Sequence, residues 1–199
     1  MDENKEVWRK YYQKSLTKKH APRTELAIRL NQTSHHIAID CGCGTGADIV
    51  FLAKKGYQVH GFDNNGEAVA ICCERFSSDP LIDISESSFE SYDYPRCGLI
   101  VANASLFFAT PTQFIETWHT LTSSLVKGGV FAGDFMGVND SWNNEYRNDI
   151  NAFTRQQVLD LFSGFNVIEL VERDEDGTTA IGKVKRWHTF SVLAVKADS

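Results

Sequence analysis

Residues 39–46 read IDCGCGTG, and this stretch decides how the rest of the chain is interpreted. It ends the short apolar run HHIAIDCG over residues 35–42, which is typical of a buried strand. Residues 46–55 follow it and have the pattern of a helix. The glycines at 42, 44 and 46 allow positive φ and close approach of a ligand to the backbone. A glycine-rich turn between a strand and a helix predicts a nucleotide-binding loop.

Outward from this loop, strand patterns alternate with helix patterns. Further strands are predicted at residues 57–63, 81–85, 98–104 and 128–135, and helices at 4–15, 22–31, 67–76, 111–124 and 154–163. Such alternation predicts an α/β fold with a parallel sheet and helices on both faces. Two last strands, 165–174 and 186–196, are joined through a turn at 175–180 without a helix, so they pair antiparallel or lie apart. We expect an antiparallel C-terminal hairpin to close the sheet.

Composition narrows the class of protein. The 199 residues carry a net charge of −6, which weighs against nucleic-acid binding because nucleic-acid binders usually have a basic face. No apolar run approaches the roughly 20 residues that span a bilayer, and the first residues lack the apolar core of a signal peptide. We therefore expect a cytoplasmic protein without a membrane segment. The five cysteines form no Cys-x-x-Cys pair, so we expect buried, reduced thiols and no metal site.

Two acids beside the loop bear on its ligand. The loop alone also fits the dinucleotide fingerprint, through Gly42, Gly44 and Ala47. Asp40, just before the first glycine, would repel a pyrophosphate but suits a ligand that carries an ammonium and a sulfonium. Asp63 ends the second strand, where an acid accepts the ribose hydroxyls of either cofactor or simply begins a turn. An NAD-dependent oxidoreductase therefore remains the alternative enzyme class.

The run from Asp40 to Gly46, with Asp63 at the end of the next strand, resembles the first two motifs of class I S-adenosylmethionine-dependent methyltransferases. Other motifs resemble the small bacterial tellurite-resistance and thiopurine type: Trp8-x-x-Tyr11-Tyr12, Pro22-Arg23, Asn103-Ala104-Ser105-Leu106-x-Phe108, Gly128-Gly129, Gly137-x-x-Asp140-Ser141-Trp142 and Lys185-x-Trp187-His188. The resemblance covers nearly the whole chain. It implies one domain over 1–199, with a doubly wound, Rossmann-like, seven-stranded, mostly parallel sheet whose C-terminal strand is antiparallel. Residues 1–34 would form a helical segment that covers the cofactor site.

The same resemblance implies S-adenosyl-L-methionine as cofactor and assigns residues to its parts. The methionine moiety would contact Asp40, Gly42, Cys43, Gly44 and Asn103, with Ser105 and Leu106 following on the loop. The ribose would lie against Asp63 and Asn64, and the adenine against Ser88, Phe89 and Glu90. The guanidinium of Arg23 has a geometry that matches the cofactor carboxylate.

Methyl transfer from a sulfonium requires alignment and exclusion of water more than covalent chemistry. No catalytic dyad is evident, and the candidates for a base are Asp134, His188 and Tyr12. Ligands of open α/β sheets lie at the carboxyl ends of the strands. Candidates for the wall of a small-molecule substrate pocket there are Tyr11, Tyr12, Phe107, Phe108, Asp134, Phe135, Met136, Trp142 and Trp187. A non-catalytic module that binds S-adenosylmethionine is a third hypothesis.

Overall fold

The computed structural model describes residues 3–145, 150–179 and 182–197. In this part of the chain the strands form one eight-stranded sheet of order β3-β2-β1-β4-β5-β8-β7, with the short β6 paired to β5. The strands are β1 Ile37–Cys41, β2 Gln58–Asp63, β3 Ile82–Glu86, β4 Cys97–Ala102, β5 Leu125–Gly137, β6 Ala152–Phe153, β7 Phe165–Thr178 and β8 Val184–Lys196. β8 pairs antiparallel with β5 and with β7, and all other strand pairs are parallel. The predicted α/β fold, with a mostly parallel sheet and an antiparallel C-terminal strand, is confirmed.

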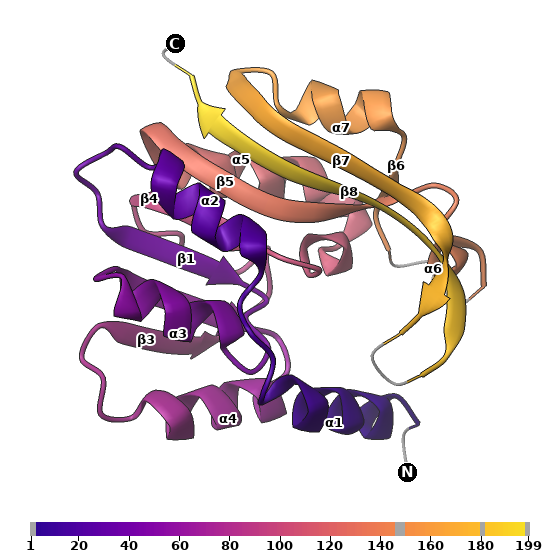
Figure 1. Cartoon of the computed structure of the whole chain (residues 1–199), viewed down its shortest axis with the longest axis horizontal. Coiled ribbons are helices and arrows are strands. Elements are labelled where there is room, and N and C mark those ends of the chain that lie inside the picture. The colour runs from indigo at the N-terminus through magenta and orange to yellow at the C-terminus, as the bar shows by residue number, and fades with distance from the viewer. Residues whose placement is uncertain (1–2, 146–149, 180–181, 198–199) are drawn as a thin grey trace.

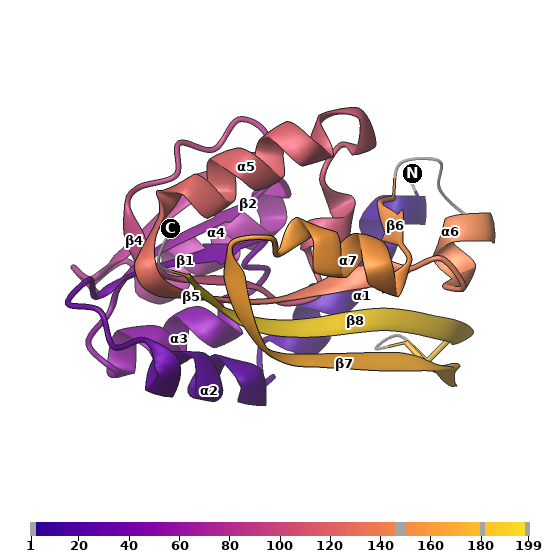
Figure 2. The same cartoon turned by 90° about the horizontal axis from the view of Figure 1, so that it is seen from above.

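Helices cover both faces of the sheet, as Figures 1 and 2 show. They are α1 Glu3–Ser15, α2 Pro22–Leu30, α3 Ala47–Lys54, α4 Gly66–Phe76, α5 Phe114–Ser124, α6 Ser141–Glu145 and α7 Arg155–Leu161, with 3₁₀ turns at Leu106–Phe108 and Pro111–Gln113. The hydrophobic core between the sheet and α2, α3 and α4 includes Leu99 and Val101 of β4. The hydrophobic core between the other face of the sheet and α5 and α7 includes Ile100 and Ala102 of the same strand. Side chains of alternate residues in β4 thus point to opposite faces of the sheet and pack into two different cores.

Three of the helices, α2, α4 and α7, begin at local sequence signals. Pro22 opens α2, because its fixed φ suits the first helical turn. The side chain of Asn65 accepts backbone N–H groups at the start of α4. Thr154 and Gln157 form a reciprocal capping box at the start of α7.

The C-terminal half differs from the sequence prediction in three details. β5 begins at Leu125 rather than at residue 128, because the pair Gly128-Gly129 lies at a register shift within the strand and does not form a turn. β7 continues past residue 174 to Thr178, since Gly177 pairs with Lys185 of β8. The short elements β6 and α6 were not predicted, because they are too brief to show a periodic pattern. In the described part of the chain, no helix is both long and apolar enough to cross a bilayer.

Candidate functional site

The glycine loop connects β1 to α3 at the carboxyl edge of the sheet. Gly42, Gly44 and Gly46 all have positive φ, at 68°, 53° and 79°. A Cβ on Gly42 would lie 2.5 Å from Cβ of Ser105, so this position also has no room for a side chain. A Cβ on Gly44 would meet no described atom within 4 Å. The open space at Gly44 is where a ligand can reach the backbone.

Asp63, the last residue of β2, is hydrogen-bonded to the glycine loop. Its Oδ2 accepts the N–H of Gly44 at 2.9 Å, and its Oδ1 accepts the N–H of Asn65 at 3.0 Å. Burial raises the pKa of the Asp63 carboxyl, although these backbone N–H groups act in the opposite direction. Each oxygen keeps a second lone pair. The carboxylate is therefore available to accept ligand hydroxyls while it holds the loop. Asn64, next in the chain, is exposed.

Asp40 places a buried carboxyl directly behind the loop. It is 4% exposed, and burial, followed by the charges of Asp48, Cys72 and Asp63, raises its pKa well above the usual range. Each of these influences disfavours the anion. A positively charged ligand group placed nearby would relieve this cost, whereas a pyrophosphate would increase it.

Cys43 occupies the centre of the loop and contacts the helix behind it. Its N–H donates to the carbonyl of Phe62 at 2.9 Å. A hydrogen bond to the thiol of Cys72, and then burial, raises the pKa of the Cys43 thiol well above its usual range. Both sulfur atoms also lie near the carbonyl of Gly44, at 4.0 Å for Cys43 and 3.2 Å for Cys72. The thiol of Cys72 in α4 thus contacts the loop at Cys43 and at the carbonyl of Gly44.

The three residues predicted to contact adenine follow β3. The ring of Phe89 is buried, packs edge-on against Phe62 at 5.3 Å, and lies beneath Gly42. Oε1 of Glu90 accepts the N–H of Thr110 at 2.6 Å. The hydroxyl of Ser88 is paired with that of Ser91 at 3.0 Å. Of the three, the ring of Phe89 thus lies nearest the glycine loop, while the polar groups of Ser88 and Glu90 bond neighbouring loop residues.

A polar network links the end of β4 to the N-terminal helical segment. Asn103 accepts a hydrogen bond from Arg23 at 3.1 Å and donates to Thr24 and Asp48, both at 3.2 Å. Thr24 in turn donates to Asp48 at 2.6 Å. Sequence analysis did not single out Thr24 and Asp48. The signal by which the sequence could identify Asp48 is its position in the first turn of the helix after the glycine loop.

Arg23 and Ser105 lie on either side of the turn after β4. Both terminal nitrogens of Arg23 are engaged, one with the carbonyl of Gly133 and the other with Asn103 and Asp134, whereas its buried Nε has no partner among the described residues. The hydroxyl of Ser105 donates to the carbonyl of Cys41 at 2.5 Å. This turn is therefore tied to both α2 and the glycine loop.

Two of the three candidate bases, Asp134 and His188, are engaged by other groups of the protein. Asp134 accepts hydrogen bonds from Ala104 and Ser191 and pairs with Arg23 at 2.8 Å. Nδ1 of His188 accepts the N–H of Asn139 at 3.0 Å, so the proton is on Nε2, which donates to Glu172 at 3.1 Å.

The hydroxyl of Tyr12 has its pKa raised by burial and by the charge of Asp63, which keeps it protonated at neutral pH. It cannot act as a phenolate base under those conditions.

Aromatic side chains from distant segments gather beside this edge. Trp8 of α1 stacks on Tyr12 at 5.8 Å and meets Phe108 edge-on at the same distance. Tyr11 lies edge-on to Trp8 at 5.7 Å. Phe107, Phe108, Met136 and Trp142 belong to one small cluster, and Trp187 lies 5.8 Å from Trp142. Phe135, in contrast, packs into the core beneath α5 and α7. The sequence marks Trp8 only as the first residue of the motif Trp8-x-x-Tyr11-Tyr12 and does not indicate its contact with Phe108.

Lys185 holds the outer part of this aromatic group. Its ammonium pairs with the fully buried carboxylate of Asp140 and lies 3.8 Å from the ring centre of Trp142 and 4.0 Å from that of Trp187. Asp140 also accepts the backbone N–H groups of Trp142 and His188, both at 3.0 Å. The motif Lys185-x-Trp187-His188 marks Lys185 in the sequence but does not indicate that its side chain is buried.

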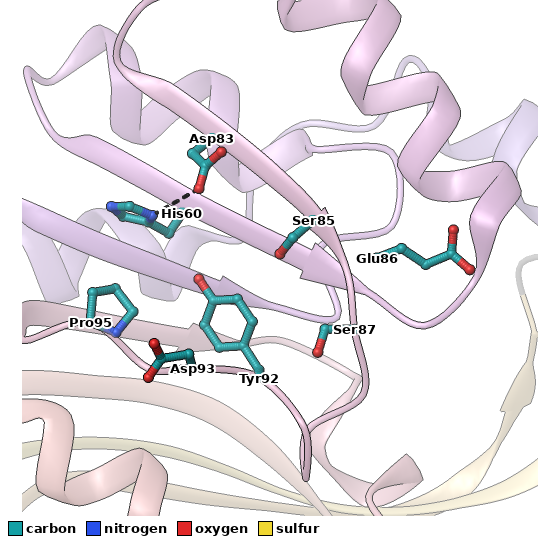
Figure 3. Close-up of a pocket in the computed structure, with 8 residues that line it drawn as sticks. All are labelled: His60, Asp83, Ser85, Glu86, Ser87, Tyr92, Asp93 and Pro95. Carbon is teal, nitrogen blue, oxygen red and sulfur yellow. Dashed lines mark ion pairs between the residues drawn. The ribbon is translucent and has the colours of Figure 1, made fainter.

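A separate hollow of about 360 Å³ lies along β2 and β3 and shares no residue with the predicted site. Figure 3 shows His60 paired with Asp83 there, at 3.3 Å, and Glu86 turned away from the others. The other residues around it are Ser85, Ser87, Tyr92, Asp93 and Pro95. Within the residues that the structure describes, no group of three or more His, Cys, Asp or Glu side chains is suited to hold a metal ion.

Comparison with known proteins supports one family. Residues 38–129 match the model of a methyltransferase domain. The carboxy-S-adenosyl-L-methionine synthase of Sulfurimonas denitrificans is 30% identical over 101 residues, which are 48% of this chain and 42% of that protein. The 2-heptyl-1-hydroxyquinolin-4(1H)-one methyltransferase of Mycobacteroides abscessus is 28% identical over 104 residues, which are 49% of this chain and 45% of that protein. The chain thus matches less than half the length of these curated relatives.

The fold has close structural counterparts. TehB of Haemophilus influenzae superposes with a TM-score of 0.74 at 17% identity, covering 90% of this chain and 63% of the TehB chain. The matched methyltransferase domain contains the glycine loop, Asp63 and the turn after β4. The chain therefore carries a methyltransferase domain over residues 38–129 and resembles the class I S-adenosylmethionine-dependent methyltransferases, whose cofactor is S-adenosylmethionine, in particular those of the TehB type.

Proposed function

We propose that this chain binds S-adenosylmethionine against the glycine loop and transfers its methyl group to a small molecule. The observation that carries the proposal is the arrangement of Asp40, the glycine loop and Asp63. A buried carboxyl with a raised pKa lies behind a loop that has open space at Gly44. A second carboxylate with free lone pairs ends the adjacent strand. These groups fit a cationic nucleoside better than a pyrophosphate.

In this proposal each end of the ligand has its own partner. Asp63 accepts the ribose hydroxyls, with Asn64 beside it, and Phe89 packs near the adenine together with Ser88 and Glu90. Asp40, Cys43 and Gly44 face the methionine moiety with Asn103 and Ser105. Arg23 supports this assignment through its buried Nε, which has no partner among the described residues and lies on the guanidinium that contacts Asn103. The carboxylate of the methionine moiety is an appropriate acceptor for it.

The bound cofactor supplies an electrophilic methyl group on a sulfonium. The protein contributes alignment of the acceptor and exclusion of water. Tyr12 and Trp8 provide a cover from α1, which is also joined to α4 by an ion pair of 3.4 Å between Arg9 and Glu67 (Figure 1). Because Asp134, His188 and Tyr12 are engaged or protonated, we expect an acceptor that is nucleophilic without a strong base from the protein.

A small acceptor suits the aromatic residues beside the site. Phe107, Phe108 and Trp142 form an apolar wall at the carboxyl edge of the sheet. Such walls are typical of pockets for small organic molecules. A curated relative carries the name of a methyltransferase for a hydroxyquinolinone, which is a compound of this kind. The negative charge of the chain gives no support to a nucleic-acid substrate.

Isothermal titration with S-adenosylhomocysteine tests cofactor binding. We expect a one-to-one complex with the wild-type chain and none with NADH. The Asp63→Ala variant should bind about tenfold or more weakly, as expected for the loss of charge-assisted hydrogen bonds worth about 1.5–3 kcal/mol. Asp83→Ala is the matched control, because Asp83 belongs to the neighbouring strand and is 71% exposed. No heat at millimolar S-adenosylhomocysteine would overturn the proposal, and binding of NADH instead would favour an oxidoreductase.

Methyl transfer itself requires a second measurement. The chain would be incubated with S-adenosylmethionine and a panel of thiols, amines, hydroxyquinolines, carboxylates and metalloid oxyanions, and formation of S-adenosylhomocysteine would be followed. Turnover with at least one member is expected. Tight cofactor binding without turnover on any member would favour the non-catalytic binding module.

A further inference from the structure

Ala104 has a backbone conformation that is unusual for its residue type. It follows Asn103 in the turn after β4 and has a φ of 53°, the one non-glycine residue with positive φ in the described part of the chain. The left-handed region is unfavourable for a residue with a Cβ, and such conformations persist only where surrounding contacts hold them. The structure shows one such contact, because Oδ2 of Asp134 accepts the N–H of Ala104 at 2.9 Å.

The carboxylate of Asp134 is itself fixed from two sides. Ser191 of β8 donates to its Oδ1 at 2.6 Å, and the guanidinium of Arg23 in α2 lies 2.8 Å from the same atom. Asp134 pairs directly with Ser191 in the antiparallel register of β5 and β8. Its side chain is 14% exposed. An acid held in this way can fix a neighbouring backbone amide and is poorly placed to take a proton from a substrate.

The turn that Ala104 forms brings its neighbours to the glycine loop. On one side, Asn103 reaches Asp48 in the first turn of α3. On the other side, Ser105 reaches the carbonyl of Cys41, and its Cβ fills the space where a side chain at Gly42 would lie. A different φ at Ala104 would move both residues relative to the loop.

We propose that Asp134 is a positioning residue, which acts through the Ala104 amide to hold the Asn103–Ser105 turn in the shape that the cofactor requires. The inference rests on the proposed function, since it concerns affinity for the cofactor. It replaces the sequence-based interpretation of Asp134 as a base or as part of the substrate wall.

The test is a comparison of four chains by titration with S-adenosylhomocysteine: wild type, Asp134→Ala, Ala104→Gly and the double variant. Asp134→Ala should weaken binding about tenfold, because alanine at 104 would then relax to negative φ. Glycine takes positive φ without cost. The double variant should therefore recover affinity to within about threefold of the wild type, and Ala104→Gly alone should stay within about threefold. If Asp134→Ala weakened binding only by disturbing the fold, adding Ala104→Gly would not restore the affinity for S-adenosylhomocysteine.

Two further measurements make the result specific. Ser191→Ala removes one of the two groups that fix Asp134 but leaves the Arg23 pair and the Ala104 bond, so it should weaken binding less than Asp134→Ala does. In NMR spectra of the free chains, the Ala104 amide proton should move upfield in Asp134→Ala, because it loses its charged acceptor.

Equal affinity of Asp134→Ala and wild type would overturn the inference alone, as would a double variant as weak as Asp134→Ala. A wild-type chain that binds no S-adenosylhomocysteine would overturn the proposed function and this inference with it.

Discussion

Gly42 and Ser105 are packed against each other so closely that a Cβ on Gly42 would lie 2.5 Å from Cβ of Ser105. Two loops that are far apart in the sequence thus meet at a position that only glycine can occupy. Gly44, two residues later, also has positive φ but faces open space. The two glycines therefore separate the effect of backbone conformation from the effect of steric contact.

We predict that Gly42→Ala destabilises the chain more than Gly44→Ala does. Gly44→Ala should cost about 1–2 kcal/mol, because alanine is disfavoured at positive φ. Gly42→Ala should cost a further ~1–3 kcal/mol, because its Cβ has to displace Ser105. The measurement is the free energy of unfolding in urea. Equal losses for the two variants would contradict the close packing at Gly42.

A second prediction concerns pH and the buried Asp40. Its pKa is raised in the folded chain, so the folded state binds a proton more tightly than the unfolded state does. Ionisation of Asp40 therefore costs stability, and this cost is present at neutral pH. It should disappear as the pH falls through the raised pKa toward the ordinary aspartate range.

The Asp40→Asn variant tests this directly. At pH 7 it should be more stable than the wild type, since the amide side chain does not ionise and so carries none of the cost of the buried carboxylate. The difference should shrink toward zero near pH 4, while affinity for S-adenosylhomocysteine at pH 7 should fall. Asp83→Asn, at an exposed position, should show neither effect. A variant less stable than the wild type at pH 7 would show that Asp40 stabilises the fold.

The same carboxyl illustrates what sequence alone can establish. The strand pattern and the glycine spacing were sufficient to predict β1, the loop and α3, because these features are local. They also placed Asp40 and Asp63 at strand ends, and parallel strands bring such ends to one edge. The pairing of Arg23 with Asp134 was not predictable, because it joins α2 to β5 through tertiary packing that leaves no periodic signal.

The start of β5 could not be predicted from the sequence, because it too depends on contacts between distant segments. A Gly-Gly pair is a common turn signal, yet Gly128 at a φ of 74° lies within β5 beside a register shift. Glycine marks turns and bulges alike, so the local sequence does not distinguish them. Whether the glycine pair forms a turn or a bulge depends on the strands that pair with β5, and these come from distant parts of the chain.

A third prediction concerns the cysteines. All five are free, and Cys73 alone among them is exposed. Burial raises the pKa of Cys97 to about 12 and that of Cys41 well above its usual range, so these thiols resist ionisation. Because thiolates are the reactive form, one thiol per chain should react quickly with Ellman's reagent under native conditions. Cys73→Ser should abolish this fast phase, and all remaining thiols should react after unfolding. A fast phase that survives in Cys73→Ser would show that a second cysteine is accessible.

The last prediction concerns Lys185, whose side chain is 5% exposed and pairs with the fully buried Asp140. Lys185→Met retains much of the side-chain volume but removes the charge that balances Asp140, and loss of one partner from a buried pair typically costs about 3–5 kcal/mol. We expect the variant to unfold at a correspondingly lower urea concentration. Adding Asp140→Asn removes the unbalanced carboxylate and should recover part of the lost stability.

The matched control is Lys183→Met, at an exposed position just before β8, which should leave the stability nearly unchanged. Because the pair is buried, salt should screen it little, and a loss that vanished in 0.5 M salt, where the screening length is about 4 Å, would identify it as a surface interaction instead.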